Sequence, residues 1–176
     1  MPKILENVRE NIIIEGRNLL LSKTYKELSI REIAKKCKIA VGTFYNYFPN
    51  KEELAVEIFR DDWKKIAILV EDLKQTEEPF KEKINKIYIA VEGFLSSYLS
   101  IFHEMSVHNN CGCREEHTIE IFFVKVSELI DIERSKGNIN SALSSYKLSK
   151  FIVSNLMQLC REKYMSFDEL YDSLKL

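Results

Sequence analysis

Apolar residues recur every three or four positions along most of the chain, a spacing that gathers them on one face of an α-helix. The first such stripe predicts a helix over residues 5–23 and consists of Val8, Ile12, Ile13, Gly16, Leu19 and Leu20. A polar capping residue with glutamate three positions later marks further helix starts at Ser29, Asn50 and Ser166. No stretch alternates between apolar and polar residues as a half-buried strand does. The pattern therefore predicts an all-α protein.

Caps and breakers set the expected helix boundaries. We expect helices over residues 5–23, 29–37, 41–48, 50–75, 79–104, 115–135, 146–163 and 167–174. A loop is expected from Val107 to Arg114, and Gly137 is expected just beyond the end of a helix, where a left-handed residue is common. We divide the chain into residues 1–50, a three-helix domain, and residues 51–176, a second helical domain.

Charge is distributed unevenly. Residues 1–51 hold ten lysines and arginines and five acids, a net charge of +5, whereas the remainder carries −6. A basic segment joined to an acidic body is typical of nucleic-acid binding, although scattered surface charge can produce it too. No apolar run reaches the ~20 residues that span a bilayer, and the four cysteines lack the spacing of a disulfide scaffold. We expect a cytoplasmic protein without a cofactor and without membrane contact.

The helices expected at 29–37 and 41–48, with the short turn between them, have the dimensions of a helix-turn-helix. The second helix of this motif enters the major groove by its N-terminal end, while the first crosses the DNA backbone. Apolar residues expected in its core are Ile30, Ile33, Ala34, Ile39 and Phe44. Basic residues left for phosphates or bases are Arg31, Lys35, Lys36, Lys38 and Lys51.

The segment from Tyr25 to Leu54 resembles the DNA-binding region of the TetR family of transcriptional regulators. The resemblance is carried by Ser29-Ile-Arg-Glu-Ile-Ala-Lys-Lys, by Val41-Gly-Thr-Phe-Tyr-Asn-Tyr-Phe and by Asn50-Lys-Glu-Glu-Leu54. It implies a helix-turn-helix DNA-binding domain and a C-terminal helical domain for ligand binding and dimerisation. It further implies a repressor that binds double-stranded operator DNA as a homodimer and is released by a small-molecule effector.

The resemblance also implies roles for single residues. Gly42 would let the recognition helix approach the DNA closely, and Tyr47 and Lys51 would contact phosphate. Arg31 and Asn46 could read base edges. The full set of expected DNA contacts is Arg31, Lys38, Val41, Gly42, Thr43, Tyr45, Asn46, Tyr47 and Lys51.

Two positions depart from the family pattern. Lys38 occupies the turn position where the family usually has glycine, and a left-handed lysine there would cost about 1 kcal/mol. Ala40 replaces the usual serine or threonine cap of the recognition helix, a loss also worth about 1 kcal/mol. Both substitutions affect local geometry more than the assignment.

An apolar stripe near the C-terminus predicts a dimer interface like that of the family, although the same residues could be intramolecular core. Its members are Leu148, Ile152, Asn155, Leu156, Leu159, Phe167, Leu170, Tyr171 and Leu174. Aromatic residues of the middle helices are expected to line an effector pocket, or else to be ordinary core. They are Phe59, Trp63, Tyr88, Phe94, Tyr98, Phe102, Phe122 and Phe123.

A short segment gathers imidazole and thiol groups, the ligands that zinc, copper and nickel prefer. It contains His103, His108, Cys111, Cys113 and His117. The Cys-x-Cys spacing differs from that of common structural zinc sites, so we expect no metal site. An enzyme is disfavoured because no Ser/His/Asp set, inward Glu-x-x-His pair or glycine-rich phosphate loop is present. An interaction protein that has lost DNA binding is disfavoured because the DNA-contact residues are retained.

Overall fold

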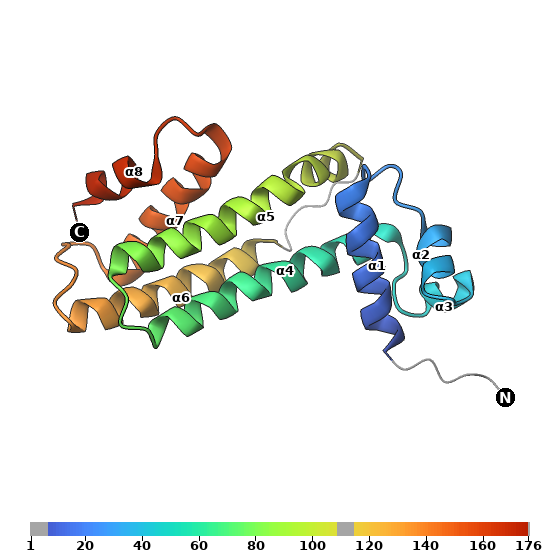
Figure 1. The fold of residues 1–176 in the computed structure, drawn as a ribbon, viewed down its shortest axis with the longest axis horizontal. Coiled ribbons are helices and arrows are strands. Elements are labelled where there is room, and N and C mark those ends of the chain that lie inside the picture. Colours follow the sequence, from blue (N-terminus) through green and yellow to red (C-terminus); the bar gives the residue numbers. More distant parts are fainter. Residues whose placement is uncertain (1–6, 109–114, 176) are drawn as a thin grey trace. The chain divides into compact units, whose positions relative to one another are not determined.

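A computed structural model describes residues 7–108 and 115–175, and all regular secondary structure in these ranges is helical. The all-α prediction is therefore confirmed. Figure 1 shows the helices in chain order: α1 (Val8–Ser22), α2 (Ile30–Lys36), α3 (Val41–Tyr45), α4 (Lys51–Lys74), α5 (Phe80–His108), α6 (Glu115–Ser135), α7 (Ser145–Glu162) and α8 (Phe167–Leu174).

The described residues form two compact units, each of which combines two separate stretches of the chain. The first unit draws on residues 1–62 and 98–111, and the second on residues 63–97 and 112–176. Helices α4 and α5 each contribute one part to each unit. The expected domain boundary after residue 50 stays a prediction.

Capping explains where several helices begin and end. Asn50 Oδ1 accepts a hydrogen bond from the Glu53 amide at 2.7 Å, which satisfies one free donor of α4. Ser166 and Glu169 form the complete reciprocal capping box at the start of α8. Gly137 has φ +80°, the left-handed conformation expected of the residue just beyond α6.

The capping box expected at Ser29 is only half formed. Ser29 Oγ accepts from the Glu32 amide at 3.4 Å, as expected. The Glu32 carboxylate instead accepts from Lys23 Nζ at 2.8 Å. A tertiary ion pair thus replaces the local return bond to the Ser29 amide.

Two helix ends differ from the prediction. Helix α3 ends at Tyr45 and not at residue 48, because the amides of Asn46 and Tyr47 turn to carbonyls three residues back. Helix α5 continues to His108, past the predicted end at residue 104 and into the predicted loop. No glycine or proline lies between Gly93 and Gly112 to stop it.

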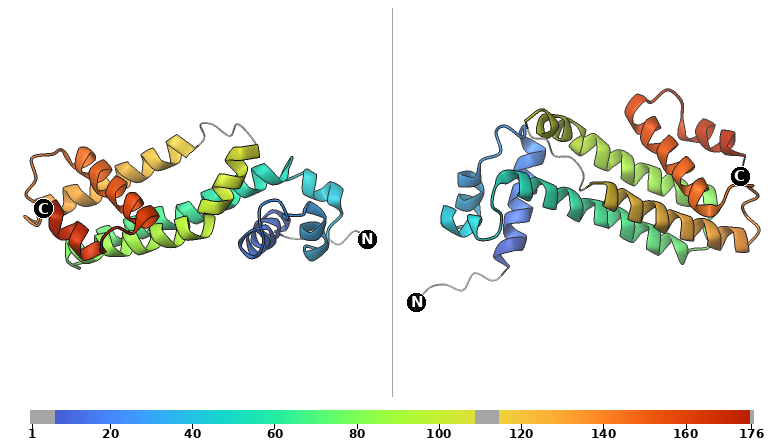
Figure 2. Two further views of the ribbon diagram at one scale, coloured as in Figure 1. Left: turned by 90° about the horizontal axis from the view of Figure 1, so that it is seen from above. Right: turned by 180° about the vertical axis from the view of Figure 1, so that it is seen from behind.

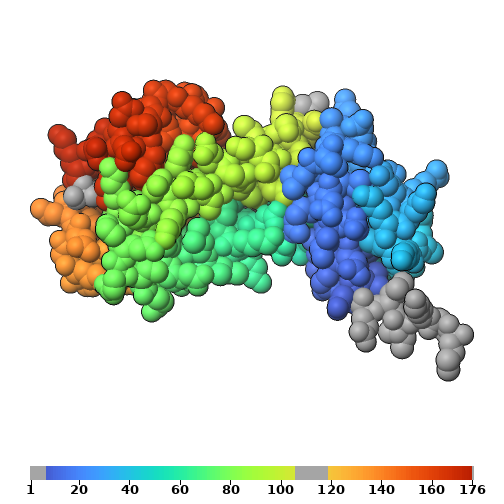
Figure 3. All heavy atoms as spheres, in the orientation of Figure 1, coloured from blue at the N-terminus to red at the C-terminus, as the bar shows by residue number. Residues whose placement is uncertain are grey.

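The second unit is built on one continuous apolar core. Its members come from α4, α5, α6, α7 and α8, and include the fully buried Val70, Ile87, Leu129 and Leu156. Helix α6 packs against α7, and α8 returns beside the start of α5 (Figure 2). On the face drawn in Figure 3, atoms of α7 and α8 lie directly against those of α5. Each such large apolar side chain contributes about 1.5–3 kcal/mol on burial.

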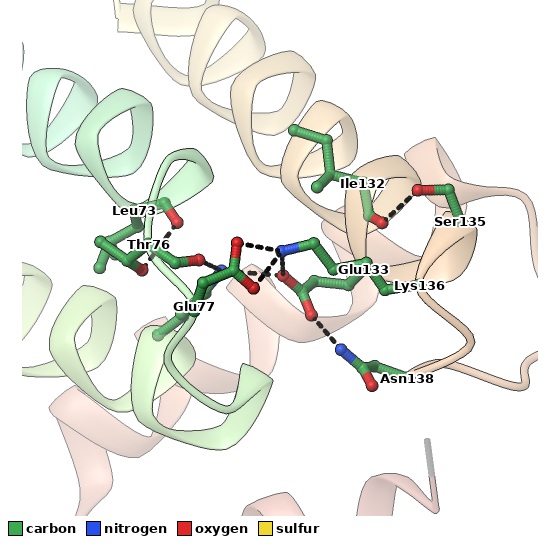
Figure 4. A network of polar contacts seen from close by, with 9 residues as sticks. Leu73, Thr76, Glu77, Ile132, Glu133, Ser135, Lys136 and Asn138 are labelled. Carbon is green, nitrogen blue, oxygen red and sulfur yellow. Dashed lines mark hydrogen bonds and ion pairs between the residues drawn. The ribbon is translucent and has the colours of Figure 1, made fainter.

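A buried ion pair lies in the same unit. Lys83 Nζ is 2.8 Å from Glu133 Oε1, and the two residues are 0% and 1% exposed. Lys83 Nζ also donates to the Thr76 carbonyl at 2.7 Å, and Asn138 Nδ2 donates to Glu133 Oε2 at 2.7 Å. Figure 4 shows Lys136 and Asn138, which follow α6, directed at Glu133, and Thr76 and Glu77 of the segment that follows α4 beside them. The network joins the ends of α4 and α6 to the first turn of α5.

The predicted dimer stripe requires a correction. Five of its members are buried inside a single chain and cannot meet a second copy: Leu148, Ile152, Leu156, Leu159 and Leu170. The ring of Phe167 stacks on Tyr88 at 5.5 Å, and that of Tyr171 lies 6.4 Å from Phe80. Asn155, Phe167, Tyr171 and Leu174 are partly buried, the last three against this core. Most of the stripe is thus intramolecular core, the alternative that the pattern left open.

Candidate nucleic-acid interface

The turn between α2 and α3 is closed by a complete Schellman motif. The Lys38 amide donates to the Lys35 carbonyl at 3.1 Å, and the Ile39 amide donates to the Ala34 carbonyl at 3.0 Å. Lys38 adopts φ +56°, as expected of a lysine in the position usually held by glycine. Ala40 makes no side-chain cap for α3, also as expected.

The inner side of α3 fixes the helix to the first unit. Phe44 is fully buried and Phe48 nearly so, and their ring centroids lie 6.0 Å apart. Ile33 and Ala34 of α2 and Ile12 of α1 are buried too. The expectation that Phe44 is a core residue is confirmed, and Phe48 is a core residue too.

Large apolar and aromatic side chains are exposed to solvent on the outer side of α3 and just after it. Val41, Tyr45 and Tyr47 are among the exposed large hydrophobic residues, Tyr45 at 50%. A Cβ placed on Gly42 would meet no atom within 4 Å. Internal packing therefore does not explain the glycine, which costs helix stability by about 0.5–1 kcal/mol relative to alanine. Close approach of an outside partner would explain it.

Positive charge surrounds this exposed side. Among the described residues, no carboxylate forms an ion pair with Arg31, Lys35 or Lys38, all of which are exposed. By contrast, Lys23 is paired with Glu32, and Lys36 lies 3.6 Å from a carboxylate of α1. Three cations are thus left for an anionic partner such as phosphate.

The side chain of Lys51, one of the predicted DNA contacts, is held by contacts within the protein. Its Nζ donates to the Tyr25 carbonyl at 3.0 Å and to the Lys26 carbonyl at 3.5 Å, and lies 4.5 Å from the centroid of the Tyr25 ring. The ammonium thus links the start of α4 to the loop between α1 and α2. To contact phosphate, Lys51 would have to give up these bonds, so its predicted phosphate contact stays a prediction. The geometry supports a structural role, in which Lys51 holds the start of α4 against the loop between α1 and α2.

A polar cluster that the sequence did not reveal lies in the same unit. Arg17 Nε donates to Asp62 at 3.2 Å, Arg17 also bonds to Asp61, and the Tyr98 hydroxyl donates to Asp62. Burial lowers the pKa of Arg17, but the two carboxylates outweigh this effect and raise it. Burial and the Asp62 charge raise the pKa of Tyr98, so its hydroxyl stays protonated. Asp62 follows Ile58 by four positions on the buried face of α4, and an acid at such a position is the signal that could have found the cluster.

The aromatic residues expected to line an effector pocket fall into separate groups. In the first unit, Phe59 lies 4.9 Å from Tyr98 and 4.4 Å from Phe102 between ring centroids. In the second, Trp63 lies 5.0 Å from Phe94 and 5.1 Å from Phe122. Also in the second unit, Tyr88 stacks on α8 and Phe123 lies beneath Lys150. One pocket lined by all eight stays a prediction.

The histidine and cysteine cluster is only partly described. Cys111 and Cys113 lie outside the described residues, as do the side chains of His108 and His117. Among the described residues, no group of three histidine, cysteine or acidic side chains could hold a metal ion. Within the same ranges, no helix is long and apolar enough to cross a bilayer.

The helix-turn-helix segment matches known proteins. Residues 12–58 match the model of the bacterial regulatory proteins of the tetR family. The chain is therefore similar to the tetR family over its helix-turn-helix segment. One relative is the HTH-type transcriptional regulator YuxN of Bacillus subtilis, 39% identical over 67 residues, which cover 38% of this chain and 23% of YuxN. Another is the dhaKLM operon transcriptional activator DhaS of Lactococcus lactis, 35% identical over 72 residues, 38% of each chain.

A wider likeness exists in the fold. The chain resembles the structure of the regulator FadR of Bacillus subtilis, solved with stearoyl-CoA, at a TM-score of 0.64 and 17% identity. The match covers 93% of this chain and 94% of FadR. Sequence similarity to the curated relatives covers at most about half of their own lengths. The family match covers residues 12–58, and the likeness to FadR over the whole chain is one of fold.

Proposed function

We propose that the chain is a transcriptional repressor that binds operator DNA as a homodimer and releases it when a small molecule binds. The observation that carries the proposal is the outer side of α3. A glycine with open space around its Cβ position lies in the same short helix as the exposed Tyr45, and the exposed Arg31, Lys35 and Lys38 belong to α2 and to the turn that leads into this helix. Such a surface suits entry of α3 into the major groove, with phosphates on either side.

The proposed contacts divide by what they can recognise. Arg31 and Asn46 are exposed and can form paired hydrogen bonds with guanine and adenine edges respectively. Val41 can touch a thymine methyl group. Thr43, Tyr45 and Tyr47 offer hydroxyl groups to phosphates or bases. The charged contacts to phosphate add affinity without sequence preference.

For dimerisation we propose a surface of α6 and α7 that differs from the predicted stripe. Glu120 and Lys150 approach within 3.6 Å across these two packed helices. The exposed apolar residues Ile121, Val124 and Phe151 lie within four positions of this pair in the sequence. A second copy that covers them would remove large apolar side chains from water, the main favourable term in association.

The dimer would repress transcription if it occupied DNA that RNA polymerase must bind. The relative DhaS is an activator, so the direction of control must be measured and not assumed. Selection from random duplexes would define an operator, and in vitro transcription from a promoter that carries it would give the sign. We expect a pseudo-palindromic site, bound at least a thousandfold more tightly than random DNA, and reduced transcription. Equal binding to all duplexes would contradict specific regulation.

A further inference from the structure

The chain contains a single tryptophan, and the nitrogen of its indole ring is buried. Trp63 is 8% exposed and belongs to the apolar core of the second unit. Among the described residues, no acceptor forms a hydrogen bond with its Nε1. The rings of Phe94 and Phe122 meet the indole edge to face. An N–H···π contact with such a ring is weaker than a hydrogen bond to oxygen.

Buried charge in this unit is already balanced. Lys83 and Glu133 pair with each other, with further bonds to Thr76 and Asn138. Arg134 Nε is buried and unpaired as well, but the same guanidinium donates through Nη2 to the Ser141 and Leu143 carbonyls. Lys83 and Glu133, the two fully buried charged residues that the described part of the unit contains, are thus paired with each other.

We infer that the effector is an uncharged, largely apolar molecule that offers an acceptor oxygen to Trp63 Nε1 between Phe94 and Phe122. The inference rests on the proposed function, because it names the kind of molecule that the regulator senses. A ketone or ester oxygen would satisfy a donor that the chain leaves unpaired, and the flanking rings would cover apolar carbon. A carboxylate or ammonium group would lose its hydration and find no opposite charge to pair with.

The inference explains why a donor is retained at this position. A phenylalanine could fill an apolar core without an unsatisfied nitrogen, since polar groups buried without partners are rare. The hydrogen bond should favour a ketone over its hydrocarbon counterpart by about tenfold, the usual net worth of one neutral hydrogen bond.

The single tryptophan permits a direct test. Protein labelled with ¹⁵N at tryptophan gives one indole N–H signal, which we would follow during titration with acetophenone and benzophenone. Ethylbenzene and diphenylmethane serve as hydrocarbons of matched shape, and benzoate as the charged control. We expect the ketones to move the indole proton downfield, the hydrocarbons to bind about tenfold more weakly, and benzoate to leave the signal in place.

Trp63→Phe is the matched variant, since it keeps an aromatic ring and removes the donor. In that variant the preference for ketone over hydrocarbon, measured calorimetrically, should fall to about one. An unmoved indole signal with both ketones, an equal affinity for ketone and hydrocarbon, or tighter binding of benzoate would overturn the inference. Operator affinity measured on the same samples separates the two proposals. If operator binding is intact and the indole does not respond, the inference alone fails, whereas a protein that binds no DNA refutes the proposed function.

Discussion

Removing one partner of the buried ion pair should destabilise the second unit strongly. Lys83→Met deletes the bonds from Nζ to Glu133 and to the Thr76 carbonyl while keeping an unbranched side chain. Glu133 would then stay buried at 1% exposure with Asn138 as its remaining close donor and Lys136 Nζ 4.0 Å away. An uncompensated buried charge costs about 3–5 kcal/mol. For a chain of this size, that lowers the melting temperature by about 6–20 °C.

Two further variants separate the charge effect from loss of packing. The double variant Lys83→Met, Glu133→Leu removes both charges, and we expect it to lie within about 1 kcal/mol of the wild type or above it. Lys86→Met on the same helix breaks an exposed pair with Glu78 that measures 2.6 Å. Its cost should be below about 1 kcal/mol, because both groups are solvated.

The same pair should make stability depend on pH. Burial raises the pKa of Glu133, but hydrogen bonds from Lys83 and Asn138 outweigh it and hold the pKa below the ordinary 4.5. A carboxylate whose pKa is lower in the folded than in the unfolded state stabilises the protein at pH values above its unfolded-state pKa. This stabilisation is lost as the pH falls through the folded-state pKa. The stability advantage of the wild-type ion pair over Lys83→Met should therefore shrink as the pH falls from about 5 to about 3. Urea unfolding of all four proteins across this range provides the measurement, and a cost for Lys83→Met below about 1 kcal/mol at neutral pH would refute the reasoning.

Three other predictions concern the DNA-binding unit and the proposed dimer surface. Lys51→Met should lower stability in urea by about 1.5–3 kcal/mol because the Tyr25 carbonyl loses a charged donor; an unchanged midpoint would favour the phosphate role instead. Lys38→Gly should raise stability by about 1 kcal/mol by relieving the left-handed backbone, yet weaken operator binding at low salt; tighter binding would show that this charge does not face phosphate. Phe151→Glu should give monomers in sedimentation while Ile89→Glu, on an equally exposed residue, does not; dimers in both would place the interface elsewhere.

Local signals in the sequence were enough to locate most of the fold. The caps at Asn50 and Ser166 and the left-handed Gly137 mark helix ends through bonds between near neighbours, so they can be read directly. The burial of Phe44 follows likewise from its place on the inner side of a short helix. The end of α5 at His108 was missed because its last turns contain no local breaker.

Long-range pairing explains what the sequence could not show. The Lys51 ammonium turns to a carbonyl 26 positions earlier, and Lys83 finds Glu133 50 positions later. Nothing in the spacing of these residues favours these partners over others. The stripe of Ile152 and Leu156 was ambiguous for a related reason: an apolar helix face shows that something covers it, and only the tertiary structure shows that the cover is the same chain.

The central claim is that the outer side of α3 enters DNA, and Gly42→Leu tests it most directly. The Cβ of a leucine at this position would meet no atom within 4 Å, and the substitution removes a glycine from a helix. The free energy of unfolding should therefore stay the same or rise by up to about 1 kcal/mol. Affinity for the selected operator, measured by fluorescence anisotropy, should fall at least tenfold, about 1.4 kcal/mol, because the added side chain stands between α3 and the groove. A stable Gly42→Leu protein that binds the operator as tightly as the wild type would contradict the account.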